Sequence, residues 1–424
     1  MKRNISICLS LLLISCGICK AQIQTSNIEE PIGFKQYLEL VTQNNLEYAA
    51  EKFNIEISEA AVELAKVFPN PSLSFDWANY SEGQSPTGYG FTSELSTTVE
   101  LGGKRKARIE LAKSEVSLSK ALLKDYFRNL RAEAAHVYLE AINQKQHYNI
   151  KQNSYETMKR LSEADSIRLL SGSIMQTDAI QSKLEAGILL NELLQEEVKL
   201  QTAMGQLKLF ASIIDESIVF KTIDTLKSIS QEFKLTDLIN KAQQNRSDLE
   251  AARFSIEASS RANTLVRKER KMDLDLSLGY GNEYFIPSVD PSSRAINGIV
   301  AIPLRFSNFN KGDLKIAELH TEQAQKIYSS VEVSIVTEIT QAFHTFKSAK
   351  IQVNNFQNNL LDQSEELMKG KIYSYERGET SLLEVLNAQR TYNEIQTTYI
   401  ETVHESYVFW IELEKAAGIW DINF

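Results

Sequence analysis

The chain has 424 residues, of which 24% are charged and 43% are hydrophobic, and its formal net charge is −9. This acidic balance lacks the clustered positive charge of nucleic-acid-binding proteins, so we expect no nucleic-acid partner. Its seven prolines leave residues 87–286 and 304–424 free of proline. Because interior prolines break helices, this distribution permits very long helices.

The first 21 residues predict a secretory signal peptide. Two basic residues precede an apolar core at 5–14, which is shorter than a transmembrane helix of about 20 residues. All three cysteines lie in this segment, so a chain cleaved before Gln22 would have no thiol for a disulfide or a metal site. The sequence Leu13–Cys16 resembles a bacterial lipobox, and lipidation of Cys16 is the alternative to cleavage before Gln22.

The rest of the chain consists of two similar halves. Leu73-Ser74-Phe75 matches Leu276-Ser277-Leu278, and both halves have the order helix, two strands, long helix, glycine turn and helix. This shared order predicts an internal duplication, with a first repeat at 22–212 and a second at 236–424. The segment 205–235 has only short, mixed apolar runs, and we expect it to form a small equatorial segment beside the helices.

Each half contains two segments in which apolar and polar residues alternate. They lie at about 72–80 and 91–101, and at about 274–284 and 294–304. Segments of about ten residues with this alternation are typical of outer-membrane barrel strands, and a soluble antiparallel sheet is the alternative. The connecting segments at 81–90 and 285–293 are rich in Gly, Pro and Ser and predict loops. Because about eight strands are needed to close a barrel, several copies would have to share one.

The first strand pair passes directly into a charged helix at "ELGGKRKAR". Gly102 and Gly103 supply a permissive backbone for the change of direction. Lys104, Arg105, Lys106 and Arg108 are expected at the membrane surface, near anionic lipid phosphates. The alternative is that they form an ordinary exposed helix start. Pro303 lies at the corresponding transition of the second half.

Long helices with heptad spacing follow each strand pair. A helix over 104–170 would be about 100 Å long, at 1.5 Å per residue. A sustained heptad repeat predicts helices packed side by side as in coiled coils. The apolar ladders are Phe127, Ala134, Ala141, Tyr148 and Tyr155 in the first half, and Ile335, Ala342, Ala349 and Phe356 together with Ile339, Phe346, Val353, Leu360 and Leu367 in the second.

With these motifs, the chain resembles the outer-membrane efflux factor family typified by TolC. The segments "FPNPSLSF" and "ELSTTVELGGKRKAR" are especially similar to the CzcC/CusC-like branch associated with metal-cation efflux. The resemblance extends over about residues 34–418. It implies a mainly α fold with a transmembrane β part, in which three protomers share a twelve-stranded barrel continuous with a long α-helical coiled-coil tunnel.

The resemblance also implies a location and partners. Such proteins lie in the outer membrane of Gram-negative bacteria, in contact with its lipid, and extend into the periplasm. They form the passive exit duct of tripartite pumps, together with a periplasmic adaptor (membrane fusion protein) and an inner-membrane RND-type transporter. The expected cargo is heavy-metal cations or drugs. A duct for type I protein secretion is one alternative, and a periplasmic coiled-coil scaffold without a pore is another.

The candidate functional residues lie at the two glycine turns, at about 170–178 and 375–384. An acid follows the turn glycine by six residues in both repeats, Asp178 after Gly172 and Glu384 after Gly378. The resemblance implies that these acids ring the periplasmic aperture, that Tyr375 helps to hold it closed, and that the glycines let adaptor hairpins approach. Thr380 and Asn387 stand where some members have an arginine and a second acid. Surface acids at helix starts and plain turn glycines are the alternatives.

The sequence gives little support to catalysis. Its five histidines are scattered along predicted helices without the spacing of a zinc site, and no phosphate-binding loop or nucleophile elbow occurs. Asp275, Glu283 and Asp290 are expected to face water on the polar side of the strands. The chain is therefore predicted to be no enzyme and to have no cofactor and no high-affinity metal site.

Overall fold

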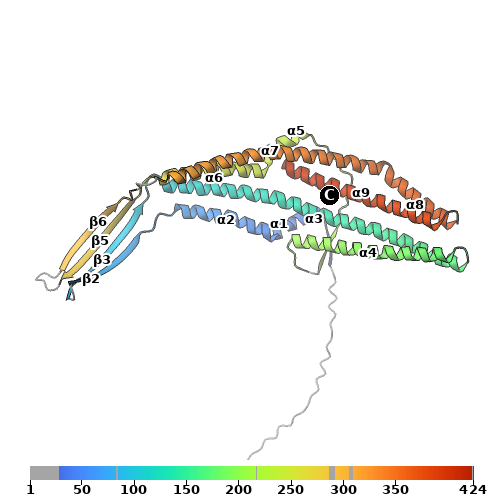
Figure 1. Cartoon of the computed structure of the whole chain (residues 1–424), viewed down its shortest axis with the longest axis horizontal. Coiled ribbons are helices and arrows are strands. Elements are labelled where there is room, and N and C mark those ends of the chain that lie inside the picture. Colours follow the sequence, from blue (N-terminus) through green and yellow to red (C-terminus); the bar gives the residue numbers. More distant parts are fainter. Residues whose placement is uncertain (1–27, 83–84, 216, 286–291, 305–308, 423) are drawn as a thin grey trace, which may run out of the picture.

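The computed structural model describes residues 28–82, 85–215, 217–285, 292–304, 309–422 and 424. The predicted signal peptide lies outside these residues, and so does Asp290. The described chain is elongated, with a β-sheet at one end and two helical hairpins at the other (Figure 1). Within these ranges, no helix is long and apolar enough to cross a membrane.

The sheet combines two strands from each half of the chain. Its strands are β2 (Ser72–Glu82), β3 (Ser85–Val99), β5 (Leu274–Phe285) and β6 (Ser292–Ala301), antiparallel and in the order β2-β3-β5-β6. The halves join at β3 and β5, where Leu95 lies opposite Leu278. Among the described residues, no strand pairs with the outer edges of β2 and β6.

One boundary differs clearly from the expectation. Residues 81–90 were expected to form a loop, but β3 begins at Ser85 and β2 extends to Glu82. A register irregularity between Tyr80 and Ser81 lets the pairing continue past the expected turn. Strand pairing therefore outweighs the glycine and proline content of this segment.

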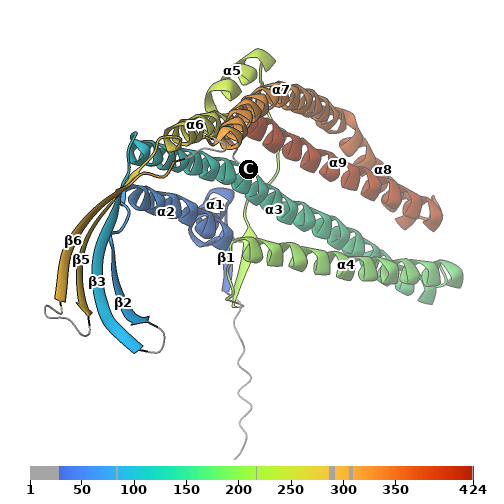
Figure 2. The same cartoon turned by 60° about the vertical axis from the view of Figure 1, so that its left-hand side comes forward.

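The two faces of the sheet differ sharply, as the alternation predicts. Leu73, Phe75 and Trp77 are 59%, 64% and 76% exposed on one face. On the other face, the Thr98 hydroxyl donates to Asp275 at 2.5 Å and the Tyr80 hydroxyl donates to Glu283 at 3.0 Å. Figure 2 shows that the whole sheet is curved. An apolar face this exposed requires an apolar environment or a partner.

The helices repeat in the same order in both halves. The first half has α1 (Phe34–Asn44), α2 (Leu46–Lys66), α3 (Lys104–Leu170) and α4 (Gln176–Phe210). The second has α5 (Leu235–Asn245), α6 (Ser247–Glu269), α7 (Lys311–Asn355), the π turn η1 (Phe356–Leu360), α8 (Leu361–Glu376) and α9 (Leu382–Ala417). The unbroken α3 has 67 residues, and its bounds are those expected from the sequence.

The middle of the molecule contains its largest core and a small sheet. β1 (Ile28–Ile32) pairs in parallel with β4 (Ile218–Thr222), which lies in the expected equatorial segment. The Tyr138 hydroxyl, buried on α3, donates to the Ile32 carbonyl at 2.8 Å and to Asp224 at 2.5 Å. These hydrogen bonds attach β1 and the equatorial segment to α3.

The second apolar ladder is interrupted at η1. Ile339, Phe346 and Val353 are at most 3% exposed, as predicted, but Leu360 and Leu367 are 43% and 47% exposed. A π turn holds an extra residue, so the side chains that follow are out of phase with those before it. Leu360 and Leu367 therefore lie outside the core of the single protomer, and the coiled-coil packing expected of them stays a prediction.

The two junction glycines allow a matched test of the strand-to-helix turn. Gly102 and Gly103 have φ values of 80° and 76°, which L-residues disfavour by about 1 kcal/mol or more. A Cβ at Gly102 would also overlap Cδ of Lys271 and lie 2.9 Å from its Cβ, whereas a Cβ at Gly103 meets nothing within 4 Å. We expect Gly102→Ala to lower the thermal unfolding midpoint distinctly more than Gly103→Ala. Equal losses would contradict this account of Gly102.

Candidate functional site

The two hairpin tips close in the same way. After α3, the Ser173 N–H donates to the Arg168 carbonyl at 2.9 Å, and after α8 the Glu379 N–H donates to the Ser374 carbonyl at 2.9 Å. Each loop has a left-handed glycine, Gly172 or Gly378, as this helix-terminating motif requires. Among the described residues, a Cβ added at either glycine would meet nothing within 4 Å, so both turns have open space at this position.

A polar contact beneath the tips joins the two hairpins. The Tyr375 hydroxyl, from α8, donates to Oδ1 of Asp165 on α3 at 3.0 Å. Arg168 stacks on the Tyr375 ring at 5.0 Å, donates to the Tyr375 carbonyl at 3.3 Å and lies 3.6 Å from Asp165. Burial, and then the Asp165 charge, raise the pKa of Tyr375, so the phenol keeps its proton. We call Asp165, Arg168 and Tyr375 the tip latch.

Sequence reasoning identified Tyr375 but missed the other two members of the tip latch. Asp165 is fully buried and follows the buried Met158 by seven residues, so it occupies a core position of the heptad. A carboxylate in such a position signals a paired group, because an unpaired buried charge is strongly unfavourable. Its Oδ2 has no hydrogen-bond partner among the described residues.

The two predicted aperture acids lie in different hairpins, each in the first turn of the second helix. Asp178 lies half-buried in the first turn of α4, close enough to Tyr375 for its charge to contribute to the raised pKa of the phenol. Glu384 is exposed in the first turn of α9 and forms an ion pair with Lys371 of α8. Hydrogen bonds from Lys371 and then Thr380 lower the pKa of Glu384.

Thr380 and Asn387 are the two positions at which the sequence departs from the family pattern. Thr380 contacts Glu384, and Arg168 provides the guanidinium beside Asp165. Asn387 is exposed on α9, one turn beyond Glu384.

The basic cluster at the strand-to-helix junction has partners within the chain. Lys104 is buried and its Nζ lies 2.6 Å from Asp273, whose other oxygen accepts from the Leu101 N–H at 3.0 Å. The expectation that Lys104 meets lipid phosphates is wrong, because a carboxylate at the start of β5 binds it inside the protomer.

Two arginines of the same cluster cap the end of α2. Arg105 donates to the Lys66 carbonyl at 2.6 Å and stacks on the Phe68 ring at 4.1 Å. Arg108 binds both oxygens of Glu100 and donates to the carbonyls of residues 65 and 67. Carbonyls at a helix end lack intrahelical partners and attract cations, which explains why these side chains turn inward. Pro303 follows β6 and is exposed.

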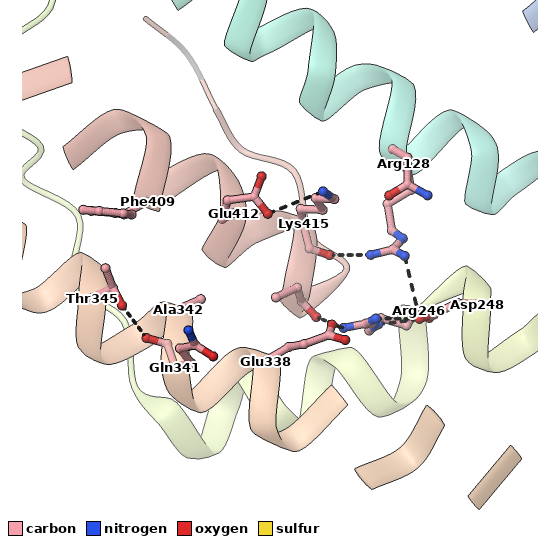
Figure 3. Close-up of a pocket in the computed structure, with 12 residues that line it drawn as sticks. Arg128, Arg246, Asp248, Glu338, Gln341, Ala342, Thr345, Phe409, Glu412 and Lys415 are labelled. Carbon is pink, nitrogen blue, oxygen red and sulfur yellow. Dashed lines mark hydrogen bonds and ion pairs between the residues drawn. The ribbon is translucent and has the colours of Figure 1, made fainter. Parts of the chain in front are cut away.

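A cavity of about 590 Å³ lies between α3, α6, α7 and α9 (Figure 3). Arg246 is 4% exposed and binds Asp248, Glu338 at 2.7 Å and the Ala416 carbonyl at 3.1 Å. Arg128 donates to the Lys415 carbonyl at 3.0 Å. These arginines cap the end of α9 with their charges already paired, so the cavity marks a joint between helices rather than a ligand site.

Three of the five histidines converge on the seam between α3 and α9, although the sequence predicted them to be scattered. His136 lies 2.8 Å from Glu412, and His404 lies 3.4 Å from Glu140. Burial lowers the pKa of His404, and the charges of His136 and His147 lower it further, against the opposing carboxylates Glu140 and Glu401. In the described ranges, no group of three or more His, Cys, Asp or Glu side chains is placed to hold a metal ion.

Comparisons with known proteins agree with this architecture. Residues 238–418 match the family described as outer membrane efflux protein. The cobalt-zinc-cadmium resistance protein CzcC of Cupriavidus metallidurans is 23% identical over 390 residues, which cover 92% of this chain and 90% of that protein. The matched family consists of efflux proteins rather than enzymes, so this chain is not an enzyme, as predicted.

Solved structures share the fold over nearly the whole chain. CusC has a TM-score of 0.73 at 17% identity, and the alignment covers 92% of each chain. The Campylobacter jejuni CmeC outer membrane channel has a TM-score of 0.74 at 16% identity, over 91% of this chain and 85% of that one.

The tip latch should be the contact that keeps the hairpins together. Tyr375→Phe removes a hydrogen bond to a buried carboxylate, a loss of about 1.5 to 3 kcal/mol. We expect faster amide hydrogen exchange in α8 and in α3 around Asp165. Tyr373→Phe is the matched control, because Tyr373 is 58% exposed and, among the described residues, its hydroxyl has a hydrogen bond with Arg377 only. Unchanged exchange in Tyr375→Phe would show that the tip latch does not hold the hairpins.

The α3–α9 seam should weaken in acid. The folded-state pKa of His404 lies below its ordinary value of about 6.5, so the unfolded chain binds the proton more readily and stability falls as pH drops below about 6.5. We expect His404→Gln to reduce the loss of thermal stability between about pH 7.5 and about pH 5.5. His320→Gln, at an exposed position of α7, should leave the loss unchanged. Identical pH dependence in both variants would contradict this role of His404.

Proposed function

We propose, from the premise that this chain is a TolC-like outer-membrane efflux factor, that it forms the passive exit duct of a tripartite RND-type pump. The observation that carries the proposal is a four-stranded sheet with an exposed apolar face and two edges that no described strand pairs with, continuous with a helical part whose longest helix, α3, is about 100 Å long.

The sheet supports a barrel made of several copies. An open strand edge is unfavourable in lipid, where no water can satisfy its N–H and C=O groups. If β2 of one protomer pairs with β6 of the next, three copies give twelve strands, with Phe75 and Trp77 toward lipid and Asp275 and Glu283 toward water. The helices would then surround a tunnel that extends into the periplasm.

The tips would form the periplasmic entrance. Three copies of Asp178 and Glu384 would place six carboxylates there, and the tip latch would hold each pair of hairpins in the closed position. The turns at Gly172 and Gly378, where the described residues leave open space around the glycines, would accept the hairpins of a periplasmic adaptor. Opening would then require the Tyr375–Asp165 contact to break.

The proposed cargo is heavy-metal cations or drugs supplied by an inner-membrane transporter. The name of CzcC, cobalt-zinc-cadmium resistance protein, favours metal cations. Protein secretion through the same fold is the alternative, and a periplasmic scaffold without a pore is a weaker one because it leaves the apolar face of the sheet without a role.

Ion selectivity should report on the aperture. Lys371 compensates the charge of Glu384, whereas Asp178 forms no ion pair within the described residues, so Asp178→Ala should reduce cation preference in planar bilayers more than Glu384→Ala. Lys371→Ala should increase cation preference, because it frees Glu384. Unchanged selectivity in the double variant of Asp178 and Glu384 would show that these carboxylates do not line the aperture.

The cellular role can be tested by deleting the gene. Deletion cells should accumulate cobalt, zinc or cadmium, measured by elemental mass spectrometry, and the restored chain should fractionate with the outer membrane as an oligomer. Normal metal and drug efflux, combined with loss of a secreted protein, would favour the secretion alternative. A soluble periplasmic monomer would contradict the duct.

A further inference from the structure

Two hydrophobic clusters connect the second hairpin of the protomer to the first, at two different levels. The larger cluster, in the middle of the molecule, includes Ile142 of α3 and Val403 of α9. The smaller cluster lies beside the tip latch and includes Met158 of α3 and Leu386 of α9. The stretch of α3 and α9 between the two clusters must therefore be held by contacts of another kind.

The contacts between α3 and α9 in this stretch are polar. The Ser154 hydroxyl lies 2.8 Å from Oδ1 of Asn393, and Nε2 of Gln389 donates to the Ser154 carbonyl at 3.2 Å. Oε1 of Gln389 and Oδ1 of Asn143 are buried without a hydrogen-bond partner among the described residues. Buried polar atoms without partners are unfavourable, so this stretch holds the hairpins less firmly than the clusters do. We call it the polar joint, comprising residues 143–154 of α3 and 389–404 of α9.

An irregular helical turn lies at the same level on the other side of α9. Gln357, in the π turn η1, donates from Nε2 to the Tyr399 hydroxyl at 3.0 Å, and the rings of Phe356 and Tyr399 are 6.3 Å apart. Helix α9 thus lies between α3 and the α7–α8 column (Figures 1 and 2). Because π turns are common points of bending and of function in helices, the second hairpin is suited to turn at this level.

His404 lies at the end of the polar joint that is farther from the tips. Its side chain is 20% exposed, and its Nε2 lies 3.4 Å from Oε2 of Glu140. Burial lowers the pKa of His404 and is the larger effect. The charges that act on it come from α3 and from α9 itself: His136 and His147 oppose its protonation, whereas Glu140 and Glu401 favour it. A proton on His404 is therefore held in a largely buried site beside other histidines.

We propose that the polar joint is a proton-sensitive pivot, at which the second hairpin turns away from the first more readily once His404 is charged. A charged imidazole favours exposure to water over a packed seam, whereas the apolar contacts on either side do not depend on pH. The π turn lets α8 follow the movement of α9. The inference rests on the duct proposed above, and it adds that mild acid favours the open entrance.

Amide hydrogen exchange of the full chain in detergent tests the pivot without requiring a conducting duct. Between about pH 7.5 and about pH 5.5, and after correction for the intrinsic rates, we expect protection in residues 389–404 to fall severalfold. His320→Gln, at an exposed position of α7, should keep this response, and His404→Gln should lose it. Helix α2 is the reference within the same molecule, because it lies near the sheet (Figure 1). An equal fall in both variants would overturn the role of His404.

A disulfide across the polar joint tests its role in opening. Residues 22–424 have no cysteine, so Ser154→Cys combined with Asn393→Cys should form one disulfide within the chain. In planar bilayers, the open probability should rise severalfold from about pH 7.5 to about pH 5.5, and carboxylates ordinarily titrate below this range. The oxidised pair should lose the rise and recover it on reduction, whereas Ser154→Cys alone should keep it.

The outcomes separate the pivot from the duct. Channels that open in acid whether or not the disulfide is formed would overturn the pivot and leave the duct in place. An acid response of the exchange that His404→Gln abolishes, without conductance at any pH, would support the pivot and contradict the duct. A loss of the rise in the oxidised pair, together with an unchanged rise in His404→Gln, would contradict control of the joint by this histidine.

Discussion

The requirement that strand edges be hydrogen-bonded in lipid determines how this protomer can be used. Its sheet has an apolar face that suits lipid, but the described chain gives no strand partner to the edges of β2 and β6. A single copy therefore cannot be a complete membrane structure, because unpaired N–H and C=O groups are strongly unfavourable there. The proposed oligomer, the tunnel and the entrance all follow from this incompleteness.

The protomer itself is held together by contacts between its two halves at each level. At the sheet end, β3 pairs with β5 and Lys104 binds Asp273. Near the middle, Arg128 of the first half caps the last turn of α9. At the far end, the tip latch joins α3 to α8. The tip latch is the contact closest to the hairpin turns, so a movement of α8 would open the proposed entrance while the other joints keep the proposed duct intact.

Much of the fold could be predicted because it depends on local periodicity. The alternation around Phe75 gave strands, and the absence of proline and the heptad ladder gave α3 its full length. Features that depend on distant partners could not be predicted in this way. Lys104 needed Asp273, 169 residues away, and Tyr375 needed Asp165, 210 residues away. The exposure of Leu367 depends on one extra residue at η1, a phase change that an ideal heptad does not reveal.

Electron cryo-microscopy of the protein extracted from the outer membrane tests the central claim most directly, because it shows what pairs with β2 and β6. The account predicts that β2 of one copy is hydrogen-bonded to β6 of the next, that three copies close a twelve-stranded barrel, and that Trp77 faces the detergent. A particle in which β2 and β6 of each copy stay unpaired, or in which Trp77 faces the lumen, would contradict it.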